Sequence, residues 1–367
     1  MAELVEGDAA RSPHRGPKRL DVVHLSDVAK LAGVSTSTAS RALAGSPLVS
    51  ERTRRRVRKA AEELHYTVNT LSKSLMGSGP SPLVFITFGL ILPHVEMVNG
   101  MSRVANEHGT TLLTSFVRHS DDYEERIITL HAQQRVRGVI LGRSGDNSPQ
   151  YVRRIRGYQQ QLQAINASLV LCARPEIPEL PEIPSVNYDQ TVVVKDAVGT
   201  LVSLGHRRIA FIGDAVHLSA RQRVEGYLAG MRSAGLEVPA HMVVPCDNTK
   251  DAGYEAAITL FRNLAGDPAP RPTAVIAYSD FVALGVYRAA RELGLSLPRD
   301  LSVIGFDDDP YAEDFTPSLS SIHVPFESIG RYAARMAFAP RASYADNPHV
   351  TLSSQLIIRD SVAPPAQ

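Results

Sequence analysis

The sequence lacks the features that define several protein classes. It has only two cysteines in 367 residues, Cys172 and Cys246, too few for a disulfide scaffold or a cysteine-rich zinc site, and they suit a reducing compartment. No run of about 18 apolar residues predicts a transmembrane helix. Residues 1–20 lack the apolar core of a secretory signal. We therefore expect a cytoplasmic protein.

Motifs of catalysis and metal binding are also missing. The chain has no G-x-S-x-G elbow, Walker loop or H-E-x-x-H motif, and no G-x-G-x-x-G after a strand. The consecutive Asp307, Asp308 and Asp309 would point in different directions at a strand end, so we expect no metal site there. No cofactor is expected. A catalytic triad scattered along the chain is left open, and an α/β enzyme stays an alternative.

The composition is that of a globular protein, with 44% hydrophobic and 21% charged residues. Its length predicts two to three domains. Residues 1–23 are expected to be a disordered extension because they are rich in Ala, Glu, Arg, Pro and Gly.

The charge is distributed unevenly. The whole chain has 39 Lys and Arg and 38 Asp and Glu, and the part up to Gly77 has 13 and 8, a net charge of +5. The remaining residues therefore carry a net charge of −4. A basic head on an acidic body indicates a polyanion-binding unit joined to a unit with another task, although basic helix faces are often only solvated.

Three short helical patterns fill residues 24–66, the predicted head. The first starts at Ser26 or Asp27 and places Val28, Ala29 and Leu31 on one side, before a turn at Gly33. The second starts at the capping Ser35 and runs to Leu43 with Thr38, Ala39 and Ala42 facing inward. The third runs from Ser50 to about Leu64, with Val57, Ala60, Ala61 and Leu64 inward.

A helix, a glycine-containing turn and a second helix form the helix-turn-helix arrangement. Its second helix enters the major groove of DNA, where its early residues contact base edges. In this chain, the predicted DNA-binding residues of that helix are Ser35, Thr36, Ser37, Ser40 and Arg41. Arg41 can bind guanine with two hydrogen bonds; the alternative is a surface arginine on an ordinary three-helix domain.

Basic residues are concentrated in the third helix. Those on its outer face are Arg52, Arg54, Arg55, Arg56, Arg58 and Lys59. As phosphate contacts they would position the head without reading sequence. One helix cannot turn all six to one duplex, so at least half of them are expected to be solvated.

Residues 25–75 closely resemble the lactose/galactose repressor family of bacterial transcription regulators. The resemblance is carried by D-V-A-x-x-A-G-V-S-x-x-T-x-S-R-x-L, then V-S-x-x-T-R-x-x-V and E-L-x-Y. It implies that Thr36, Ser37 and Arg41 lie where members of the family place base-reading side chains.

The resemblance also implies a hinge helix and linker over residues 67–80, which forms when two subunits meet on DNA. Asn69, Lys73 and Leu75 match its DNA-binding positions, and Leu75 corresponds to a leucine wedged into the minor groove. This chain has Val68 where the family usually has proline, and Lys73 where arginine is common. The alternative for Leu75 is a linker residue packed on the body.

Apolar runs alternate with helical patterns from residue 83 onward, which predicts a two-lobed α/β body with parallel sheets. The strands are expected at 83–88, 111–117, 136–141, 169–172, 208–212, 274–277 and 302–306. The helices are expected near 95–108, 121–134, 150–164, 190–204, 220–234, 250–264 and 280–293.

The body, residues 81–359 with a tail at 360–367, is also similar to the family, and its C-terminal half matches better. The matching blocks are GHRRIAFIG, SARQRVEGYLAGM, AYSDFVALGVYRAARELGLSLPRDLSVIGFDDDP and TPSLSSIHVPFESIG. They imply a periplasmic-binding-protein-like fold with an effector between the lobes. By this resemblance, the effector-binding residues are Arg223, Asp307, Ser279 and Asp280, with His94 as a further candidate. An ion pair of Arg223 with Asp307 or Asp280 is the alternative.

The N-terminal half departs from the family. The stretch ITFGLILPHVEMVNG lacks the aspartate and the Asn-Pro-Phe-Phe that many relatives have, and Ala173-Arg174-Pro175 stands where they often have Asp-Arg-Pro. These losses argue against a standard sugar effector and leave an atypical effector or a vestigial pocket.

The resulting hypothesis is a transcriptional regulator, a repressor, that binds a palindromic operator in double-stranded DNA as a homodimer. A small-molecule effector, a sugar or another metabolite, would modulate its DNA affinity. The sequence leaves one other binding class open. A solute-binding transport receptor has the same two-lobed fold, but the basic head and the missing signal argue against it.

Overall fold

The computed structural model describes residues 23–66, 81–89, 91–117, 121–142, 148–213, 218–263, 271–344 and 346–366. The chain divides into two units, residues 1–73 and 74–367. The part of the expected extension before residue 23 and the expected hinge, with Asn69, Lys73 and Leu75, lie outside the described residues.

The head, in the first unit, is a bundle of three mutually contacting helices: α1 (Leu25–Ala32), α2 (Thr36–Leu43) and α3 (Glu51–Glu63). Gly33 ends α1 in the left-handed conformation, with φ of 60°, which glycine adopts without strain. Ser35 and Ser50 cap α2 and α3 by accepting hydrogen bonds from the backbone N–H groups of Thr38 and Thr53. The helix-turn-helix arrangement is confirmed.

The first helix differs from its prediction. It starts at Leu25 rather than at Ser26 or Asp27, with His24 as the N-cap residue, and Asp27, at the third helical position, accepts a hydrogen bond from the backbone N–H of His24 in a capping box. Val28, Ala29 and Ala32 are buried, whereas Leu31 is 48% exposed. The prediction that Leu31 faces inward was wrong because residues 28 and 32, four apart, share the buried face.

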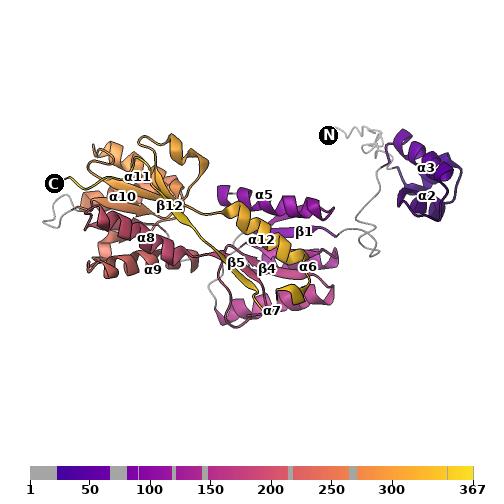
Figure 1. The fold of residues 1–367 in the computed structure, drawn as a ribbon, viewed down its shortest axis with the longest axis horizontal. Helices are drawn as coiled ribbons and strands as arrows, with labels where there is room; N and C mark the ends of the chain where they lie inside the picture. The colour runs from indigo at the N-terminus through magenta and orange to yellow at the C-terminus, as the bar shows by residue number, and fades with distance from the viewer. Residues whose placement is uncertain are drawn as a thin grey trace, which may run out of the picture. The chain divides into compact units, whose positions relative to one another are not determined.

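The second unit, the body, consists of two lobes, each built on a six-stranded sheet (Figure 1). The N-lobe sheet has the order β11-β5-β4-β3-β1-β2, and the C-lobe sheet has the order β12-β10-β9-β8-β6-β7. The pairs are parallel apart from β10 with β12. The prediction of two α/β lobes is confirmed.

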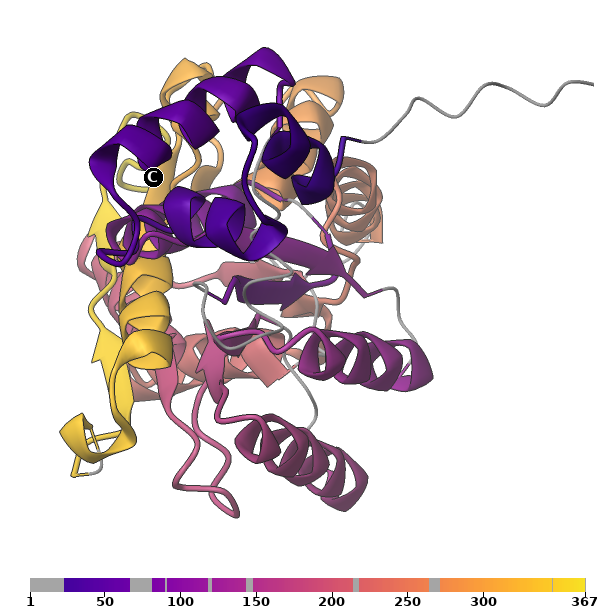
Figure 2. The same ribbon diagram turned by 90° about the vertical axis from the view of Figure 1, so that its right-hand side faces the viewer.

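In the N-lobe, helices cover both faces of the sheet (Figure 2). The strands are β1 (Leu83–Thr87), β2 (Leu112–Phe116), β3 (Gly138–Leu141), β4 (Ser168–Cys172), β5 (Ser185–Tyr188) and β11 (His349–Leu352). The helices are α5 (Leu92–Glu107), α6 (Asp121–Gln133), α7 (Pro149–Ala164) and α12 (Phe326–Phe338). Leu83 and Phe85 of β1 belong to the core under α5 and α12, and Val84 and Ile86 belong to the core under α6 and α7. Alternating side chains thus fill both faces.

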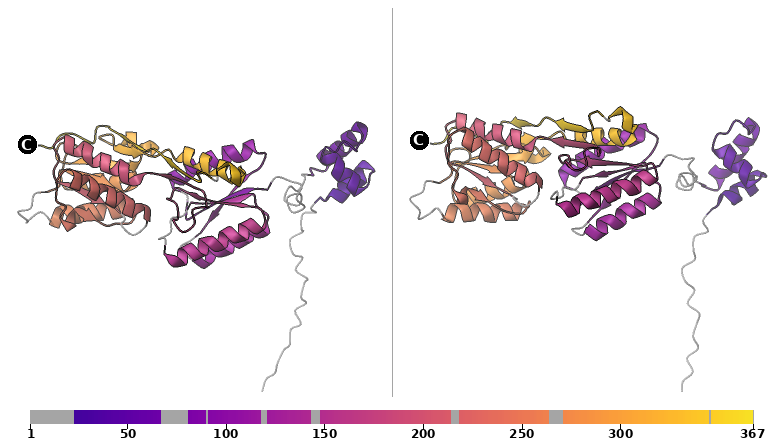
Figure 3. Two further views of the ribbon diagram at one scale, coloured as in Figure 1. Left: turned by 60° about the horizontal axis from the view of Figure 1, so that its bottom comes forward. Right: turned by 90° about the horizontal axis from the view of Figure 1, so that it is seen from below.

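The C-lobe repeats this layering (Figure 3). Its strands are β6 (Ile209–Ile212), β7 (Val243–Val244), β8 (Ala274–Ala277), β9 (Ser302–Asp307), β10 (Ser320–His323) and β12 (Gln355–Ile357). Its helices are α8 (Gln190–Ser203), α9 (Leu218–Ser233), α10 (Lys250–Asn263) and α11 (Asp280–Glu292). The core beneath α8 and α9 continues into the N-lobe core beneath α5 and α12. The chain passes between the lobes after β5, after β10 and after β11.

The predicted strands and helices of the body are all present within a few residues of their expected bounds. The elements that the sequence did not predict are β5, β7, β10, β11, β12 and α12. The missed strands are only two to four residues long, and most include polar residues, so they show no apolar run.

The C-terminal segment is part of the C-lobe. Ser361 is 0% exposed, and its hydroxyl donates to the carbonyl of Val303 at 2.6 Å. The imidazole Nε2 of His206 lies 2.9 Å from the carbonyl of Ala363. The tail expected from residue 360 therefore does not begin there, because these hydrogen bonds hold residues 361–363 on the sheet.

Candidate functional site

Helix α2 presents a polar, exposed face in the head. Ser35, Thr36, Ser37, Ser40 and Arg41 are all exposed, while Ala39 and Ala42 of the same helix are fully buried. The turn at Gly33 and the cap at Ser35 fix where this face begins. The structure thus brings together the five residues that the sequence assigned to this helix.

The residues of this face differ in whether their side chains form hydrogen bonds within the head. The Ser35 hydroxyl accepts from the Thr38 amide at 3.1 Å and lies 2.8 Å from the Thr38 hydroxyl. No described residue forms a hydrogen bond or ion pair with the guanidinium group of Arg41. Its five N–H donors are therefore available to an external acceptor, such as the O6 and N7 atoms of guanine.

Helix α3 uses two of its six basic residues inside the head. Arg54 pairs with Glu51 at 2.7 Å and donates to the carbonyls of Ser46 and Val49. Arg56 reaches the carbonyl of Gly33 at 3.5 Å. The other four basic residues, Arg52, Arg55, Arg58 and Lys59, are exposed and have no partner among the described residues. Arg54 is neither solvated nor available as a phosphate contact, because it binds the loop before α3.

Two leucines of the head are exposed, and the sequence indicated neither of them as exposed. Leu31 is 48% exposed and Leu48 is 85% exposed. The Gly45-Ser46-Pro47 stretch before Leu48 predicted only a break between helices, so no sequence signal distinguished this side chain.

Arg223 is the centre of the candidate site in the body. Its side chain extends from α9, and the residue is 4% exposed. Its Nε donates to Oε1 of Gln190 at 2.8 Å, its Nη2 to the hydroxyl of Tyr188 at 3.0 Å, and its Nη1 to the carbonyl of Tyr278. Tyr188 ends a strand of the N-lobe sheet, so the arginine connects the C-lobe to the N-lobe.

Two aromatic rings lie against the same guanidinium group. The Cζ atom of Arg223 is 3.6 Å from the ring centroid of Phe306 and 4.3 Å from that of Tyr278. Burial lowers the pKa of Arg223, but Tyr188, Tyr278 and Asp307 more than offset this effect, so its net shift is upward. The group is a permanent cation whose hydrogen bonds and ring faces are used within the protein.

Asp307 is the carboxylate partner of this arginine. One of its oxygens, Oδ1, lies 3.6 Å from Nη2 of Arg223, and its side chain is 10% exposed. Burial raises the pKa of Asp307 to about 7, against the effect of Arg223, and nearby Asp309 and Glu96 raise it further. The ion pair of Arg223 with Asp307, which the sequence left as the alternative to ligand binding, is present, and its N···O distance is longer than a hydrogen bond.

Asp280 and Ser279 are fixed at the start of α11. Asp280 is 0% exposed, and its carboxylate accepts from the Ser321 hydroxyl at 2.6 Å and from the Asp309 amide at 2.8 Å. Burial raises the pKa of Asp280 well above its usual value, although these two hydrogen bonds act in the opposite direction. Ser279 caps α11 and donates to Oδ1 of Asn248 at 2.5 Å. Asp280 therefore holds the loop that follows Asp307, the last residue of β9, through the backbone of Asp309.

His94 lies in a different environment, at the start of α5 in the N-lobe. The residue is 5% exposed, its Nδ1 is 2.7 Å from the carbonyl of Gly89, and its ring meets the edges or faces of Phe85 and Phe88. Burial lowers the pKa of His94. No contact joins His94 to Arg223 or Asp307 among the described residues, so the structure does not bring it to the arginine.

Glu96, on the same helix, is a carboxylate that the sequence analysis did not single out. Burial raises the pKa of Glu96; nearby His323 lowers it, and nearby Asp309, Glu327 and Asp308 raise it. Glu96 is thus a partly buried carboxylate of the N-lobe whose pKa is affected by charged residues of the C-lobe. In the sequence, only the position of Glu96 on the same helix as His94, two residues further along, could have suggested this residue.

The arginine of Ala173-Arg174-Pro175 turns into the N-lobe. Arg174 is 0% exposed, its Nη1 donates to the hydroxyl of Tyr151, and its Cζ is 5.0 Å from the centroid of that ring. Burial lowers its pKa, and Tyr151 raises it. At this position the N-lobe supplies a buried internal contact instead of a carboxylate.

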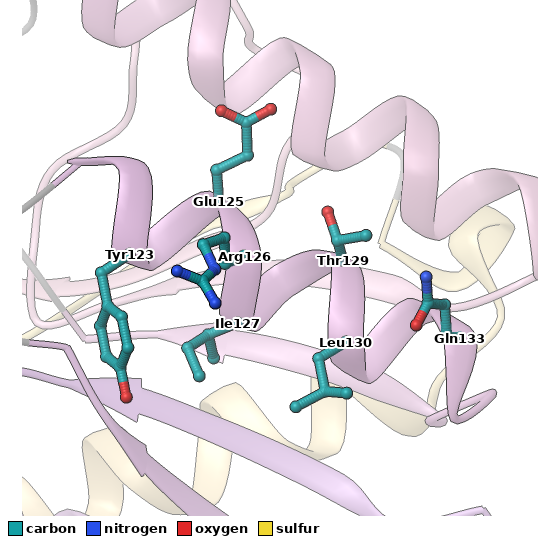
Figure 4. A pocket seen from close by; sticks show the side chains of 7 residues that line it. All are labelled: Tyr123, Glu125, Arg126, Ile127, Thr129, Leu130 and Gln133. Carbon is teal, nitrogen blue, oxygen red and sulfur yellow. The ribbon is translucent and has the colours of Figure 1, made fainter.

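Among the described residues, no group of His, Cys, Asp and Glu has an arrangement that could hold a metal ion. In the same part of the chain, no helix is both long and apolar enough to cross a membrane. A hollow of about 590 Å³ lies along one face of α6, where Tyr123, Ile127, Thr129 and Leu130 contribute side chains (Figure 4). It is remote in sequence from the residues around Arg223.

Two family models match the chain. The model described as bacterial regulatory proteins, lacI family, matches residues 24–69. The model described as periplasmic binding protein-like domain matches residues 198–362. The first range covers the head. The second covers the C-lobe from within α8 onward, together with α12 and β11 of the N-lobe.

Several proteins are similar to this chain over most of its length. Catabolite control protein A of Priestia megaterium is 30% identical over 86% of this chain and 91% of its own. The ribose operon repressor of Escherichia coli (strain K12) is 31% identical over 84% of this chain and 90% of its own. The HTH-type transcriptional repressor CytR of the same strain is 30% identical over 95% and 98%.

Solved structures agree with these relatives. The lac repressor dimer bound to operator and the anti-inducer ONPF is 25% identical, with a TM-score of 0.81, and the match covers 93% of this chain and 99% of that one. The complex of the transcriptional regulator CelR with cellobiose is 28% identical, with a TM-score of 0.66 and coverage of 93% and 100%.

Proposed function

The chain belongs to the lacI family of bacterial regulatory proteins and is a DNA-binding transcriptional regulator, and we propose that it is a cytoplasmic repressor acting as a homodimer on a palindromic operator. A small molecule held between the lobes of the body would alter its affinity for DNA. The observation that carries this proposal is the exposed polar face of α2, on which Arg41 has no partner among the described residues.

In the proposed complex, α2 lies in the major groove. Arg41 donates to guanine, and the hydroxyls of Thr36, Ser37 and Ser40 contact neighbouring base edges. Ser35 contributes by fixing the first turn, because its hydroxyl caps the helix. The four free basic residues of α3 contact phosphates and position the head. Asn69, Lys73 and Leu75 of the hinge would contact the minor groove.

A homodimer is proposed because one head reads only a few base pairs, and a two-fold pair doubles the contacts. The N-lobe offers an apolar surface for a second copy. Strand β2 is at the edge of its sheet, with Phe116 43% exposed, and α6 exposes Leu130 to 45% beside the hollow of Figure 4. Charged substitution of both, Phe116→Asp with Leu130→Asp, is expected to give monomers in light scattering.

The proposed effector contacts come from the C-lobe. Arg223 and Asp307 form an ion pair near the end of β5, where the chain first passes between the lobes. Asp280 holds the loop after β9, and Ser279 caps α11 and binds Asn248. Arg223 also donates a hydrogen bond to Tyr188 at the end of β5. A ligand that displaces this hydrogen bond, or the ion pair of Arg223 with Asp307, would therefore change how the lobes are held together. That change would reach the heads as a shift between two states of different DNA affinity. We leave His94 outside the proposed contacts.

The proposal predicts how two arginines differ in DNA binding. Arg41→Ala should reduce the preference for operator over unrelated duplex by roughly 10- to 100-fold, the loss of one bidentate base contact. Arg52→Ala, the matched control on α3, should weaken binding to both duplexes equally. Fluorescence anisotropy on labelled DNA from upstream of the gene, repeated over a salt series, measures both quantities. Equal weakening of both duplexes by Arg41→Ala would assign Arg41 to phosphate contact.

The other classes are not favoured. Its relatives are transcriptional regulators and repressors rather than enzymes. We therefore propose no catalytic activity and no cofactor. A transport receptor is disfavoured because such a protein needs no DNA-reading head.

A further inference from the structure

The turn between α2 and α3 carries the most exposed large apolar side chain among the described residues. Leu48 is 85% exposed, whereas Val49 beside it is 7% exposed and belongs to the core of the head. Single exposed leucines are common on protein surfaces, so exposure alone assigns no role. This leucine differs because the turn that carries it is held at both ends.

The backbone of the turn is closed by its own hydrogen bonds. The amide of Val49 donates to the carbonyl of Ser46 at 3.2 Å, which makes residues 46–49 a β-turn with Pro47 and Leu48 at its two central positions. Proline fixes the backbone angle φ at the first of these positions. The amide of Leu48 donates to the hydroxyl of Ser46 at 3.4 Å. The leucine side chain is therefore carried on the tip of an ordered turn.

Arg54 holds the same turn from α3. Its Nη2 donates to the carbonyl of Ser46 at 3.1 Å and to that of Val49 at 3.4 Å, which are the two ends of the turn. Its Nη1 pairs with Glu51 at 2.7 Å, and the buried side chain of Val49 fixes the turn on the core. An apolar side chain on a tip that is already ordered loses little backbone entropy when it binds a partner.

The turn continues the face of α2 that is proposed to read DNA. The exposed residues of that face are three or four apart, on one side of the helix: Ser37, Ser40, Arg41 and the C-cap residue Ala44. The amide of Ser46 donates to the carbonyl of Arg41 at 3.0 Å, so the turn is joined directly to the last helical turn of α2. Leu48 thus follows the proposed guanine contact at the end of the reading face.

Charge indicates what this side chain contacts. Arg41 and Arg52 on either side of the turn are exposed and have no partner among the described residues. Glu51, the one acidic residue between them, is paired with Arg54. The leucine is therefore an apolar point within a basic surface, which suits a polyanion better than an apolar protein surface. In its major groove, DNA offers one apolar group, the C5-methyl of thymine.

We propose that Leu48 is a specificity-determining residue that packs against the C5-methyl group of a thymine in each half of the operator. This inference rests on the proposed function, in which α2 lies in the major groove. Cytosine presents an N4 donor in that groove and no methyl group, and leucine has no atom that could accept from it. Arg41 and Leu48 then read different bases of one half-site, the first by hydrogen bonds and the second by apolar contact.

The test removes the methyl group and nothing else. The starting duplex is the tightest-binding sequence that the full chain selects from random duplexes. Each thymine of the half-site is replaced by deoxyuridine, in both halves at once, and fluorescence anisotropy measures the affinity. At one position we expect binding to weaken by about tenfold, the loss of two buried methyl contacts. A half-site without thymine, or one in which no replacement weakens binding, would overturn the proposal.

Leu48→Ala shows whether this side chain makes the contact. The variant should bind the thymine and deoxyuridine duplexes of that position equally, as in a double-mutant cycle. Leu31→Ala, at the other exposed leucine of the head, is the matched control and should keep the full difference, because α1 does not enter the groove. Truncation of so exposed a side chain should leave thermal unfolding unchanged. A methyl preference that survives Leu48→Ala contradicts the proposal.

A second variant tests the same contact without modified bases. Leu48→Asn, used in the selection from random duplexes, should lose the enrichment of thymine at that position and keep the guanine that Arg41 contacts. Unchanged thymine enrichment would contradict the proposal. Equal weakening of the thymine and deoxyuridine duplexes by Leu48→Ala would also contradict it, because the leucine would then contact protein, such as the second head, rather than the base.

The same samples separate this inference from the proposed function. A chain that enriches an inverted repeat but binds its deoxyuridine duplexes as tightly as the thymine duplex retains the proposed function and loses the role of Leu48. A chain that enriches no sequence contradicts both.

Discussion

The two lobes of the body have the same sheet order but opposite chemistry at their strand ends. In the C-lobe, the residues at the ends of β8 and β9 are polar: Tyr278, Ser279 and the three aspartates 307–309. Of these, Tyr278 and Asp307 contact Arg223. In the N-lobe, the end of β1 is followed by Phe88, packed on His94, and Arg174 after β4 turns into the core. Shared topology therefore does not imply a shared role, because a sheet positions strand ends without dictating their side chains.

This contrast agrees with the family comparison. The periplasmic binding protein-like model matches residues 198–362, which include most of the C-lobe, and does not extend over the N-lobe strands before them. The polar groups that suit a ligand are concentrated in the matched part. The N-lobe contributes Glu96 and the hydroxyl of Tyr188. Three substitutions test whether the lobes divide the work in this way.

The largest effect is expected from Arg223→Met. Removing the guanidinium group leaves Asp307 buried without its cation and breaks three hydrogen bonds, which should lower the free energy of unfolding by about 3–5 kcal/mol. Urea denaturation followed by circular dichroism measures the change. Arg223→Met combined with Asp307→Asn should recover part of the loss, because no unpaired charge remains. A double variant as unstable as the single one would show that packing, rather than charge, dominates at this position.

The pH dependence of stability should differ between the unmodified chain and Asp307→Asn. The pKa of Asp307 rises from 3.8 to about 7 on folding, so between these values the folded chain holds a proton that the unfolded chain releases. The stability from this group is complete below pH 4 and is lost as pH rises through 7, with a slope of at most about 1.4 kcal/mol per pH unit. Urea titrations at pH 5, 6, 7 and 8 should show a flatter profile for Asp307→Asn. Asp196→Asn should keep the original slope; a similar flattening there would remove Asp307 as the cause.

The smallest effect is expected in the N-lobe, from His94→Phe. A phenyl ring keeps the packing against Phe85 and Phe88 but loses the hydrogen bond to Gly89, which costs about 1 kcal/mol. Because burial lowers the pKa of His94, the lost group is a neutral imidazole near pH 7, and no charge is left unpaired. The response of DNA binding to an effector should stay unchanged. A lost response at unchanged stability would give the N-lobe strand ends a direct part in binding.

Local signals in the sequence predicted the head well. Ser35 and Ser50 cap their helices as expected, and the small apolar residues of α2 and α3 are buried. The exception is Leu31, because α1 buries Ala32, four residues after Val28, instead of Leu31. Caps and short periodic patterns depend on residues three or four apart, which is why they can be read from one segment.

In the body, local sequence signals predicted only part of the structure. Strands with apolar runs were predicted, whereas β10 and β11 were not, since their polar residues are buried or paired only after distant segments meet. Ser320 accepts from the Arg359 amide at 2.8 Å, and Ser185 meets His349 at 2.9 Å, across 39 and 164 residues of sequence. The ion pair of Arg223 with Asp307 was foreseen as an alternative, but its partners Tyr188 and Gln190 were not. They belong to the crossover after β5, a strand that the sequence did not reveal.

The central claim is that paired heads of this chain read a two-fold DNA site through α2. Selection of binding sequences from random duplexes, by the full chain and by Arg41→Ala, tests it most directly. We expect the unmodified chain to enrich an inverted repeat containing guanine at symmetric positions, and Arg41→Ala to lose the preference for those guanines. Recovery of random sequences by the unmodified chain, or of a site without two-fold symmetry, would contradict the account.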